Sequence, residues 1–135
     1  METSNKGAVG KLEVMKRLTA EDLCVSSPHV DKGIDVMASD GGNCYNIEVK
    51  TCIFQDGQHK SLIAAAGKGK TLSEDARNSD LVVVKLDSDL DLIEFLVFKN
   101  EEIPDVKTLR VIRNSGADWM YSKYIKPISY LFENE

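Results

Sequence analysis

Residues 34–53 constrain the fold of this chain more than any other segment. Residues 34–39 and 44–53 alternate in polarity, which is the pattern of half-buried β-strands, and the Asp-Gly-Gly-Asn sequence between them has the chemistry of a short turn. If the two glycines form the loop, counting back along both strands places Asp35 directly opposite Glu48. A four-residue loop gives the same pairing, whereas a loop of odd length would break it. The sequence therefore predicts a β-hairpin in which two acidic side chains face each other.

The same alternation sorts the side chains of the second strand into two faces. Glu48 and Lys50 share one face, while Ile47 and Val49 point into a core. Directly opposed residues have Cβ atoms roughly 4.5–5.5 Å apart, and two like charges at that distance destabilise the strand pair. A divalent cation would compensate for this repulsion. The Lys50 ammonium, roughly 6.6 Å along the strand from Glu48, adds positive charge beside the pair.

The ligand chemistry predicts which cation would bind. Carboxylate oxygens without His or Cys in the cluster suit Mg²⁺ or Mn²⁺ rather than Zn²⁺. The alternative is an ordinary solvated sheet face, on which Asp35 and Glu48 point to water and Lys50 screens them.

These residues resemble the motif of a known family. Gly33-x-Asp35, a glycine hairpin and then Glu48-x-Lys50 followed by Thr51 are similar to the signature of the PD-(D/E)XK nuclease superfamily. That superfamily includes restriction endonucleases and archaeal Holliday junction resolvases. The resemblance implies an enzyme that cleaves DNA.

The resemblance extends to the order of the elements. The superfamily core has a helix, a meander of three strands, and then a helix and a further strand; residues 6–18 and 23–26 are similar to its first helix and first strand. The implied fold class is α/β, with a restriction-endonuclease-like core whose central mixed β-sheet of about five strands is flanked by helices. No linker or repeat interrupts the chain, so residues 1–135 are expected to form a single nuclease-like domain.

The resemblance also implies roles for individual residues. Asp35 and Glu48 would be metal ligands, the Val49 main-chain carbonyl a third ligand, and Lys50 the residue that positions or deprotonates the attacking water. These residues make up the expected catalytic site, with Mg²⁺ or Mn²⁺ as cofactor. Ile34 stands where the proline that names the superfamily would be.

A further acid on the first helix is left open. Resolvase-like members carry one, typically four residues after a glycine near the start of that helix. Four residues after Gly7 is Lys11, whereas Glu13 lies three residues after Gly10. Glu13 is therefore either an additional metal ligand or a solvent-facing helix residue.

Basic residues that could contact DNA concentrate after the hairpin. Lys60, Lys68 and Lys70 could line a cleft that follows a phosphate backbone, and they are the expected nucleic-acid-binding residues. Lys32 near the hairpin is a weaker candidate. The net charge of −5 argues mildly against a non-specific nucleic-acid coat, because Lys and Arg supply phosphate binding. The alternative is a solvated basic loop.

The rest of the chain supplies further elements and a candidate interface. Aromatic residues gather near the C-terminus, where core packing is the first interpretation and a homodimer interface the alternative, because duplex cleavage needs two active sites. Further expected elements are a short helix at residues 73–78, strands at 81–86, 92–98 and 109–112, a segment of uncertain type at 61–66, and a helix at 118–125 that Pro127 interrupts.

Cellular location is inferred from what the sequence lacks. The N-terminus has no basic start followed by an apolar region, as a signal peptide would, and no apolar run approaches the roughly 20 residues of a membrane span. The three cysteines fall in expected strands and are interpreted as reduced apolar fillers. We therefore expect a cytoplasmic protein that does not bind membranes.

Together these observations predict a metal-dependent endodeoxyribonuclease that hydrolyses DNA phosphodiester bonds. Within that class it would be restriction-endonuclease-like or Holliday junction resolvase-like. The alternative from another class is a catalytically inactive nuclease-fold module that binds DNA or protein.

Overall fold

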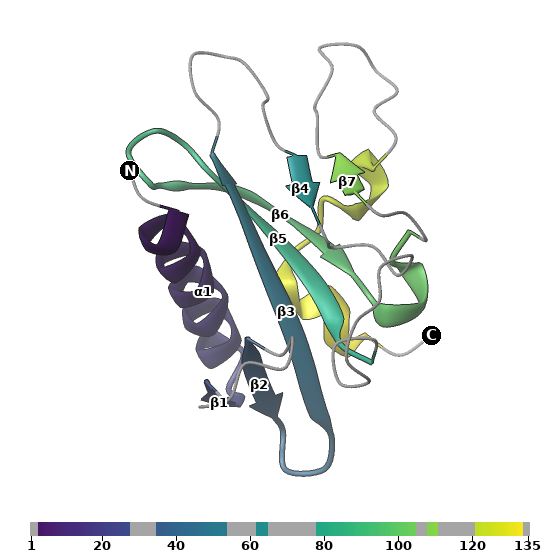
Figure 1. Cartoon of the computed structure of the whole chain (residues 1–135). Coiled ribbons are helices and arrows are strands. Elements are labelled where there is room, and N and C mark those ends of the chain that lie inside the picture. Colours follow the sequence, from purple (N-terminus) through teal and green to yellow (C-terminus); the bar gives the residue numbers. More distant parts are fainter. Residues whose placement is uncertain are drawn as a thin grey trace.

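The computed structural model of the chain describes residues 3–27, 35–53, 62–64, 78–104, 108–110 and 121–133. Figure 1 shows one long helix beside a twisted β-sheet. The elements are α1 (Thr3–Ala20), β1 (Cys24–Ser26), β2 (Val36–Ser39), β3 (Cys44–Ile53), β4 (Leu62–Ala64), β5 (Asp80–Leu86), β6 (Leu92–Phe98), β7 (Thr108–Arg110) and the 3₁₀ turns η1 (Asn100–Glu102), η2 (Ser122–Tyr124) and η3 (Ile128–Phe132).

The main sheet has five strands in the order β1-β2-β3-β5-β6. Neighbouring strands are antiparallel except β3 and β5, which are parallel, so the sheet is mixed, as the family resemblance implied. Strands β4 and β7 pair separately as a small antiparallel sheet. The α/β fold class and the mixed sheet of five strands are confirmed.

The β2–β3 hairpin has the predicted register. Val36 pairs with Ile47 and Ser39 with Cys44, and the N–H of Asp40 donates to the carbonyl of Asn43 over 3.2 Å. The loop is therefore the two glycines. The first of them has φ +93°, a backbone conformation that favours glycine. The Asp40 carboxylate accepts the N–H groups of Asn43 and Gly42, which lowers its pKa.

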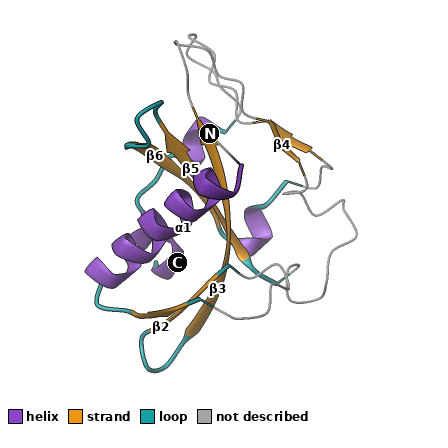
Figure 2. Ribbon diagram, turned by 60° about the vertical axis from the view of Figure 1, so that its left-hand side comes forward, coloured by secondary structure: helices purple, strands orange, loops and turns teal. Residues whose placement is uncertain are grey.

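Helix α1 lies on one face of the sheet, along β3 (Figure 2). Its buried side chains, Val14 and Leu18, recur at helical spacing and join Ile47 in the larger of two core clusters. Gly10, on the same helix face, meets Thr51 of β3 so closely that a Cβ at Gly10 would overlap the threonine Oγ1. The helix can approach the sheet this closely only because that position has no side chain.

The second core cluster lies on the opposite face. Its buried members are Cys52, Leu81, Val83, Leu96 and Phe98, which have the strand parity of Glu48 and Lys50. Two C-terminal tyrosines pack against Phe98: the Tyr124 and Tyr121 ring centroids lie 4.4 and 6.1 Å from its own. The C-terminal segment then crosses the β6 edge, where Ile125 bridges to Leu96, and η3 packs on the α1 face.

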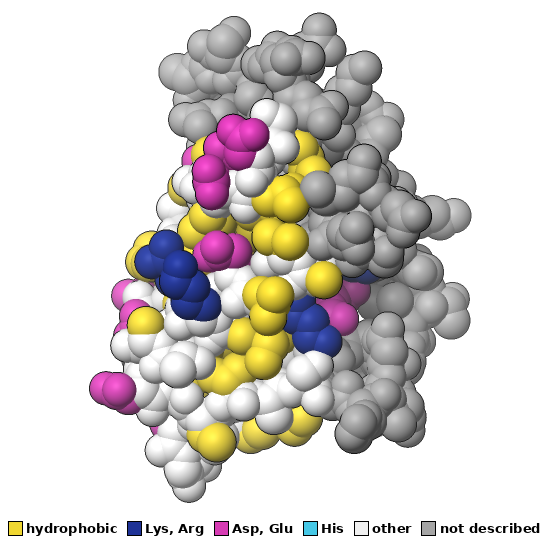
Figure 3. Space-filling model, turned by 90° about the vertical axis from the view of Figure 1, so that its left-hand side faces the viewer, with side chains coloured by type: hydrophobic (Ala, Val, Ile, Leu, Met, Phe, Trp, Pro, Cys, Tyr) yellow, Lys and Arg dark blue, Asp and Glu magenta, His cyan; other side chains and the backbone are white. Residues whose placement is uncertain are grey.

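Within the described residues, the C-terminal aromatic side chains are therefore used in packing. Tyr45 and Phe132 also meet edge to face, with ring centroids 4.7 Å apart. The most exposed large hydrophobic side chain among the described residues is elsewhere: Leu12 on α1 is 63% exposed. Figure 3 shows hydrophobic side chains in a stripe on the side of the molecule where α1 lies.

Some expectations differ from the structure. Cys24 and Cys44 are exposed, so their interpretation as apolar fillers is wrong, whereas Cys52 is buried; all three are free thiols. Cys24 lies on the short edge strand β1 and Cys44 next to the exposed glycine turn, and neither place is enclosed on both faces.

The expected helix at 118–125 is described only from Tyr121, where it is a 3₁₀ turn. The expected helix at 73–78 lies outside the described residues except for Asn78.

Strand β5 also contains a buried charged residue among its apolar side chains. Lys85 is completely buried, and its Nζ lies 3.1 Å from Oε2 of Glu94 on β6, the residue it pairs with in the ladder. No helix in the described part of the chain is long and apolar enough to cross a membrane.

Candidate active site

Asp35 is anchored to the main chain of β3 at the end of the hairpin. Its N–H donates to the carbonyl of Ile47 over 3.0 Å, and its carboxylate Oδ2 accepts the N–H of Val49 over 2.7 Å. The ladder between β2 and β3 begins only at the next residue, where Val36 pairs with Ile47. The Ile47 carbonyl therefore accepts the Asp35 N–H although the ladder partner of Ile47 is Val36. The predicted register holds up to Val36, but Asp35 itself is not a ladder partner of Glu48.

The bond to Val49 fixes the direction of the Val49 carbonyl. In a β-strand the N–H and C=O of one residue point to the same neighbouring strand, since paired residues exchange both bonds. Because the N–H of Val49 points to Asp35, its carbonyl points to the same edge of β3. The Ile47 carbonyl, two residues earlier, also points to that edge, where it accepts the Asp35 N–H. A carboxylate and a main-chain carbonyl thus lie together at this edge.

Glu48 and Lys50 flank Val49 and project from one face, as the strand parity predicted. Lys50 Nζ lies 3.3 Å from Glu48 Oε1, and the exposed fractions of the two side chains are 32% and 10%. Leu81 of β5 lies beside Glu48, and Phe98 of β6 follows in the same cross-strand row; both are fully buried. The carboxylate of Glu48 therefore stands at the border between the packed core and the accessible ammonium of Lys50.

The oxygen groups around this point fit a hard divalent cation. Mg²⁺ is usually held by one or two carboxylates and keeps several of its waters. Asp35 uses Oδ2 for Val49, so Oδ1 keeps its lone pairs for a ligand. Within the described residues no three His, Cys, Asp or Glu side chains gather as a metal-binding group. The oxygen atoms that remain as candidate ligands are those of the Asp35 and Glu48 carboxylates and of the Val49 carbonyl.

Asn46 is a polar residue near this site that the sequence analysis did not single out. Its Oδ1 is buried and has no hydrogen-bond partner among the described residues. It lies two residues before Glu48 on β3 and, by strand parity, on the same face. That parity was already readable from the sequence.

Glu13 lies in the middle of α1, which packs on the face opposite to Glu48 and Lys50. Its Oε2 is buried and has no hydrogen-bond partner in the described part of the structure. Its carboxylate therefore does not point fully into solvent, as one of the two alternatives for Glu13 expected. It also forms no group of three acidic ligands with Asp35 and Glu48 among the residues described.

The expected DNA-contacting lysines, Lys60, Lys68 and Lys70, lie outside the described residues, and so does Lys32. These assignments stay predictions.

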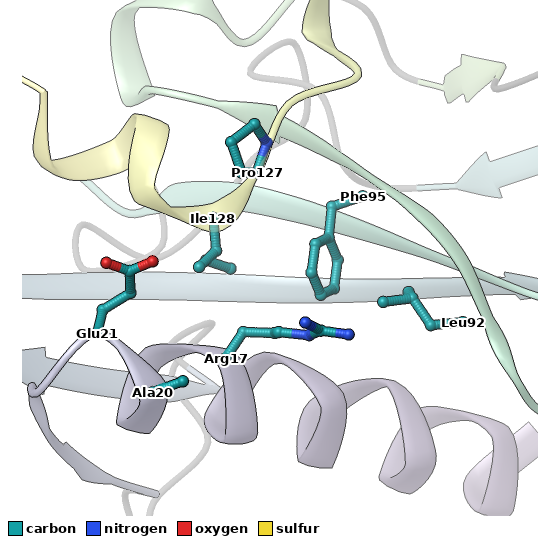
Figure 4. Close-up of a pocket in the computed structure, with 7 residues that line it drawn as sticks. All are labelled: Arg17, Ala20, Glu21, Leu92, Phe95, Pro127 and Ile128. Atoms are coloured by element: carbon teal, nitrogen blue, oxygen red, sulfur yellow. The ribbon is translucent and has the colours of Figure 1, made fainter.

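A cavity lies elsewhere, between the C-terminal end of α1, strand β6 and η3. It has a volume of about 330 Å³ and is lined by Arg17, Ala20, Glu21, Leu92, Phe95, Pro127 and Ile128. In Figure 4 the Arg17 side chain extends past Phe95 toward Leu92. The cavity is on the α1 side of the sheet and contains none of the expected site residues.

Comparison with known proteins identifies the fold. No protein-family model matches this chain, and no curated protein matches it by sequence. A solved endonuclease shares its fold. This is the bacterial homing endonuclease I-Ssp6803I, with a TM-score of 0.61 and 15% sequence identity, over 91% of this chain and 86% of that one.

Proposed function

We propose that this protein is a metal-dependent endodeoxyribonuclease of the PD-(D/E)XK type. The observation that supports it best is the anchoring of the Asp35 carboxylate on the Val49 N–H, between Glu48 and Lys50. That arrangement stands on a fold shared with a homing endonuclease. The fold likeness favours DNA as substrate, and the oxygen ligands favour Mg²⁺ or Mn²⁺ as cofactor.

Asp35, Glu48 and the Val49 carbonyl would hold the cation. When bound, the cation would polarise a phosphate oxygen and lower the pKa of a coordinated water. The hydrogen bond from Val49 keeps the Asp35 carboxylate in one orientation without using its charge. The apolar neighbours Leu81 and Phe98 exclude water from one side of Glu48, which strengthens its interaction with positive charge.

Lys50 would act on the water and on the phosphate. Its ammonium is held 3.3 Å from Glu48 Oε1, yet its side chain is 32% exposed, so a phosphate can approach it. As a cation it would orient the attacking water and stabilise the negative charge that develops on the phosphate oxygens. The water oxygen forms a bond to phosphorus and gives up one proton to solvent, the bond from phosphorus to the leaving sugar oxygen breaks, and that oxygen takes up one proton from solvent.

A cleavage assay tests the proposal. Supercoiled plasmid, linear duplex, single-stranded DNA and a four-way junction would each be incubated with wild type and with Glu48→Ala, with and without Mn²⁺. We expect Mn²⁺-dependent cutting by wild type that Glu48→Ala abolishes. Preference for the four-way junction would indicate a resolvase, and preference for duplex a restriction-like or homing-type enzyme. Cutting that survives in Glu48→Ala would refute the assigned site.

The second candidate is a nuclease-fold module that binds DNA or protein without cleaving it. The Glu48–Lys50 ion pair favours this candidate, because it neutralises Glu48 without any cation. Calorimetry with Mn²⁺ separates the two: the nuclease binds the cation at Asp35 and Glu48, whereas the binding module does not. A protein that binds DNA but neither binds Mn²⁺ nor cuts any of the four substrates would be the module.

A further inference from the structure

Asn46 stands next to the proposed cation site without belonging to the expected motif. It lies on β3, with Met37 of β2 as its ladder partner, and strand parity puts it on the face of Glu48 and Lys50. Glu48 is two residues away, roughly 6.6 Å along the strand. Asp35 lies diagonally across, because its N–H donates to the carbonyl of Ile47, the residue that follows Asn46.

The Asn46 side chain contains a hydrogen-bond acceptor that no described residue satisfies. Its Oδ1 is buried and finds no donor among the described residues. A buried acceptor without a partner costs free energy, and native structures usually satisfy such a group with an ordered water or an ion. The oxygen therefore marks a point where a donor that is not part of the described chain is expected.

The charged neighbours cannot supply that donor. The ionised carboxylates of Asp35 and Glu48 are acceptors only. Lys50, which has donors, directs its Nζ to Glu48 Oε1 and lies four residues from Asn46 along β3. A hydrated Mg²⁺ or Mn²⁺ does supply donors, because such ions keep several waters whose O–H groups point outward.

We infer that Asn46 is a positioning residue of the metal centre, whose Oδ1 accepts a hydrogen bond from a water on the divalent cation held by Asp35 and Glu48. This inference rests on the proposed function, because it requires a cation at that site. Asn46 fixes the orientation of one coordinated water and so raises the affinity of the site for the ion. Partners of this outer kind typically change metal affinity about 10–100-fold when they are removed.

The same strand contains a matched control. Thr51 Oγ1 is also buried and without a hydrogen-bond partner in the described residues, but Thr51 faces α1 at Gly10 on the other side of the sheet. Replacing either residue by an apolar side chain of similar shape removes one unsatisfied oxygen from the same strand. Only the Asn46 replacement should also alter the cation site.

The test is Mn²⁺ binding by calorimetry and by the Mn²⁺-induced rise in Tm, for wild type, Asn46→Leu and Thr51→Val. We expect Asn46→Leu to raise the Kd for Mn²⁺ about ten-fold or more, while Thr51→Val leaves that Kd unchanged. Asn46→Asp keeps the side-chain shape and adds negative charge, so it should lower the Kd for Mn²⁺. This variant also tests the role of Asn46 if Asn46→Leu does not fold.

Each outcome has a separate meaning. Unchanged Mn²⁺ affinity in both Asn46→Leu and Asn46→Asp, with binding that still depends on Asp35 and Glu48, would overturn the role of Asn46 and leave the nuclease proposal standing. A wild type that binds no Mn²⁺ would overturn both. An equal loss of affinity in Asn46→Leu and Thr51→Val would show a general effect on β3 and would also contradict the inference.

Discussion

The carboxylate of Asp35 accepts the main-chain N–H of Val49 over 2.7 Å, so the acid of one strand is fixed to the backbone of the next. This bond joins the Asp35 motif position to the segment that carries Glu48 and Lys50. It also turns the Val49 carbonyl toward Asp35. We therefore expect stability and the proposed chemistry to depend on different properties of the same side chain: an acceptor atom for the first, a negative charge for the second.

Two substitutions of Asp35 separate these properties. Asp35→Asn keeps an acceptor for the Val49 N–H, so we expect stability near that of wild type, together with loss of Mn²⁺ binding and of cleavage. Asp35→Ala leaves that N–H without its partner and should cost about 1–3 kcal/mol of unfolding free energy in addition. Urea denaturation and a plasmid-cleavage assay measure the two effects. Full cleavage by Asp35→Asn would contradict the assigned metal site.

Substitution of Lys50 should affect catalysis far more than DNA binding. Lys50→Ala removes the ammonium that would stabilise charge on the phosphate, so we expect cleavage to fall about 10²-fold or more. Binding of duplex DNA, measured by fluorescence anisotropy in Ca²⁺, should change little, since one partly exposed lysine is a small part of a phosphate interface. Lys16→Ala, which removes an exposed lysine from α1, is the matched control. Lys50→Ala that cuts at the wild-type rate would end the assignment.

The hairpin shows how much of the site the sequence could predict. Turn chemistry and strand parity are local properties, and they correctly predicted the register of β2 with β3, for a loop of two or of four residues, and the shared face of Glu48 and Lys50. The position of Asp35 outside the ladder was not predicted, because the alternation of polarity does not report where strand pairing ends. In the structure the Asp35 carboxylate accepts the Val49 N–H, and Asp35 does not pair with Glu48 in the ladder.

Other features depend on packing between distant segments, which periodicity does not report. Lys85 is the charged residue of the strand expected at 81–86, and its partner in the sheet interior, Glu94 on β6, could not be predicted from the strand pattern. Cys44 and Cys52 have the same strand parity but opposite burial, since one is beside the turn and the other lies in the sheet interior. Neither distinction follows from composition.

The contact between Gly10 and Thr51 predicts a strong difference between two helix glycines. A Cβ at Gly10 would overlap Thr51 Oγ1, so Gly10→Ala should force α1 away from β3 and cost about 1–3 kcal/mol. A Cβ at Gly7 would meet no atom within 4 Å. Gly7→Ala should therefore stabilise the helix by roughly 0.5–1 kcal/mol. Thermal unfolding of the two variants gives the comparison.

A double variant locates the origin of that cost. Thr51→Ala removes the hydroxyl and the methyl group that the new Cβ would meet. Gly10→Ala combined with Thr51→Ala should therefore lose less stability than the sum of the two single variants, because the overlap with Oγ1 is gone in the double and only the Cβ of residue 51, at 3.0 Å, remains close. Strict additivity would mean that Gly10→Ala acts through something other than Thr51.

The carboxyl of Asp80 at the start of β5 predicts how stability changes with pH. Burial raises its pKa above the ordinary value of 3.8, and Glu101 nearby adds to the rise, while the N–H that Asn100 donates over 2.9 Å lowers it. The folded protein thus holds this proton more tightly than the unfolded chain does. The resulting stabilisation is complete below the ordinary pKa and is lost as the pH rises through the folded pKa.

Asp80→Asn tests this relationship, because asparagine cannot ionise and its Oδ1 can still accept the Asn100 N–H. At pH 7 the variant should unfold at a higher temperature than wild type, since the wild type then carries a partly buried carboxylate. The difference should shrink as the pH falls toward 4 and the wild-type carboxyl becomes protonated. Asp89→Asn, at an exposed turn position, removes the same charge and should show no such convergence. A Tm difference for Asp80→Asn that stays constant between pH 7 and 4 would show that ionisation of Asp80 does not affect stability.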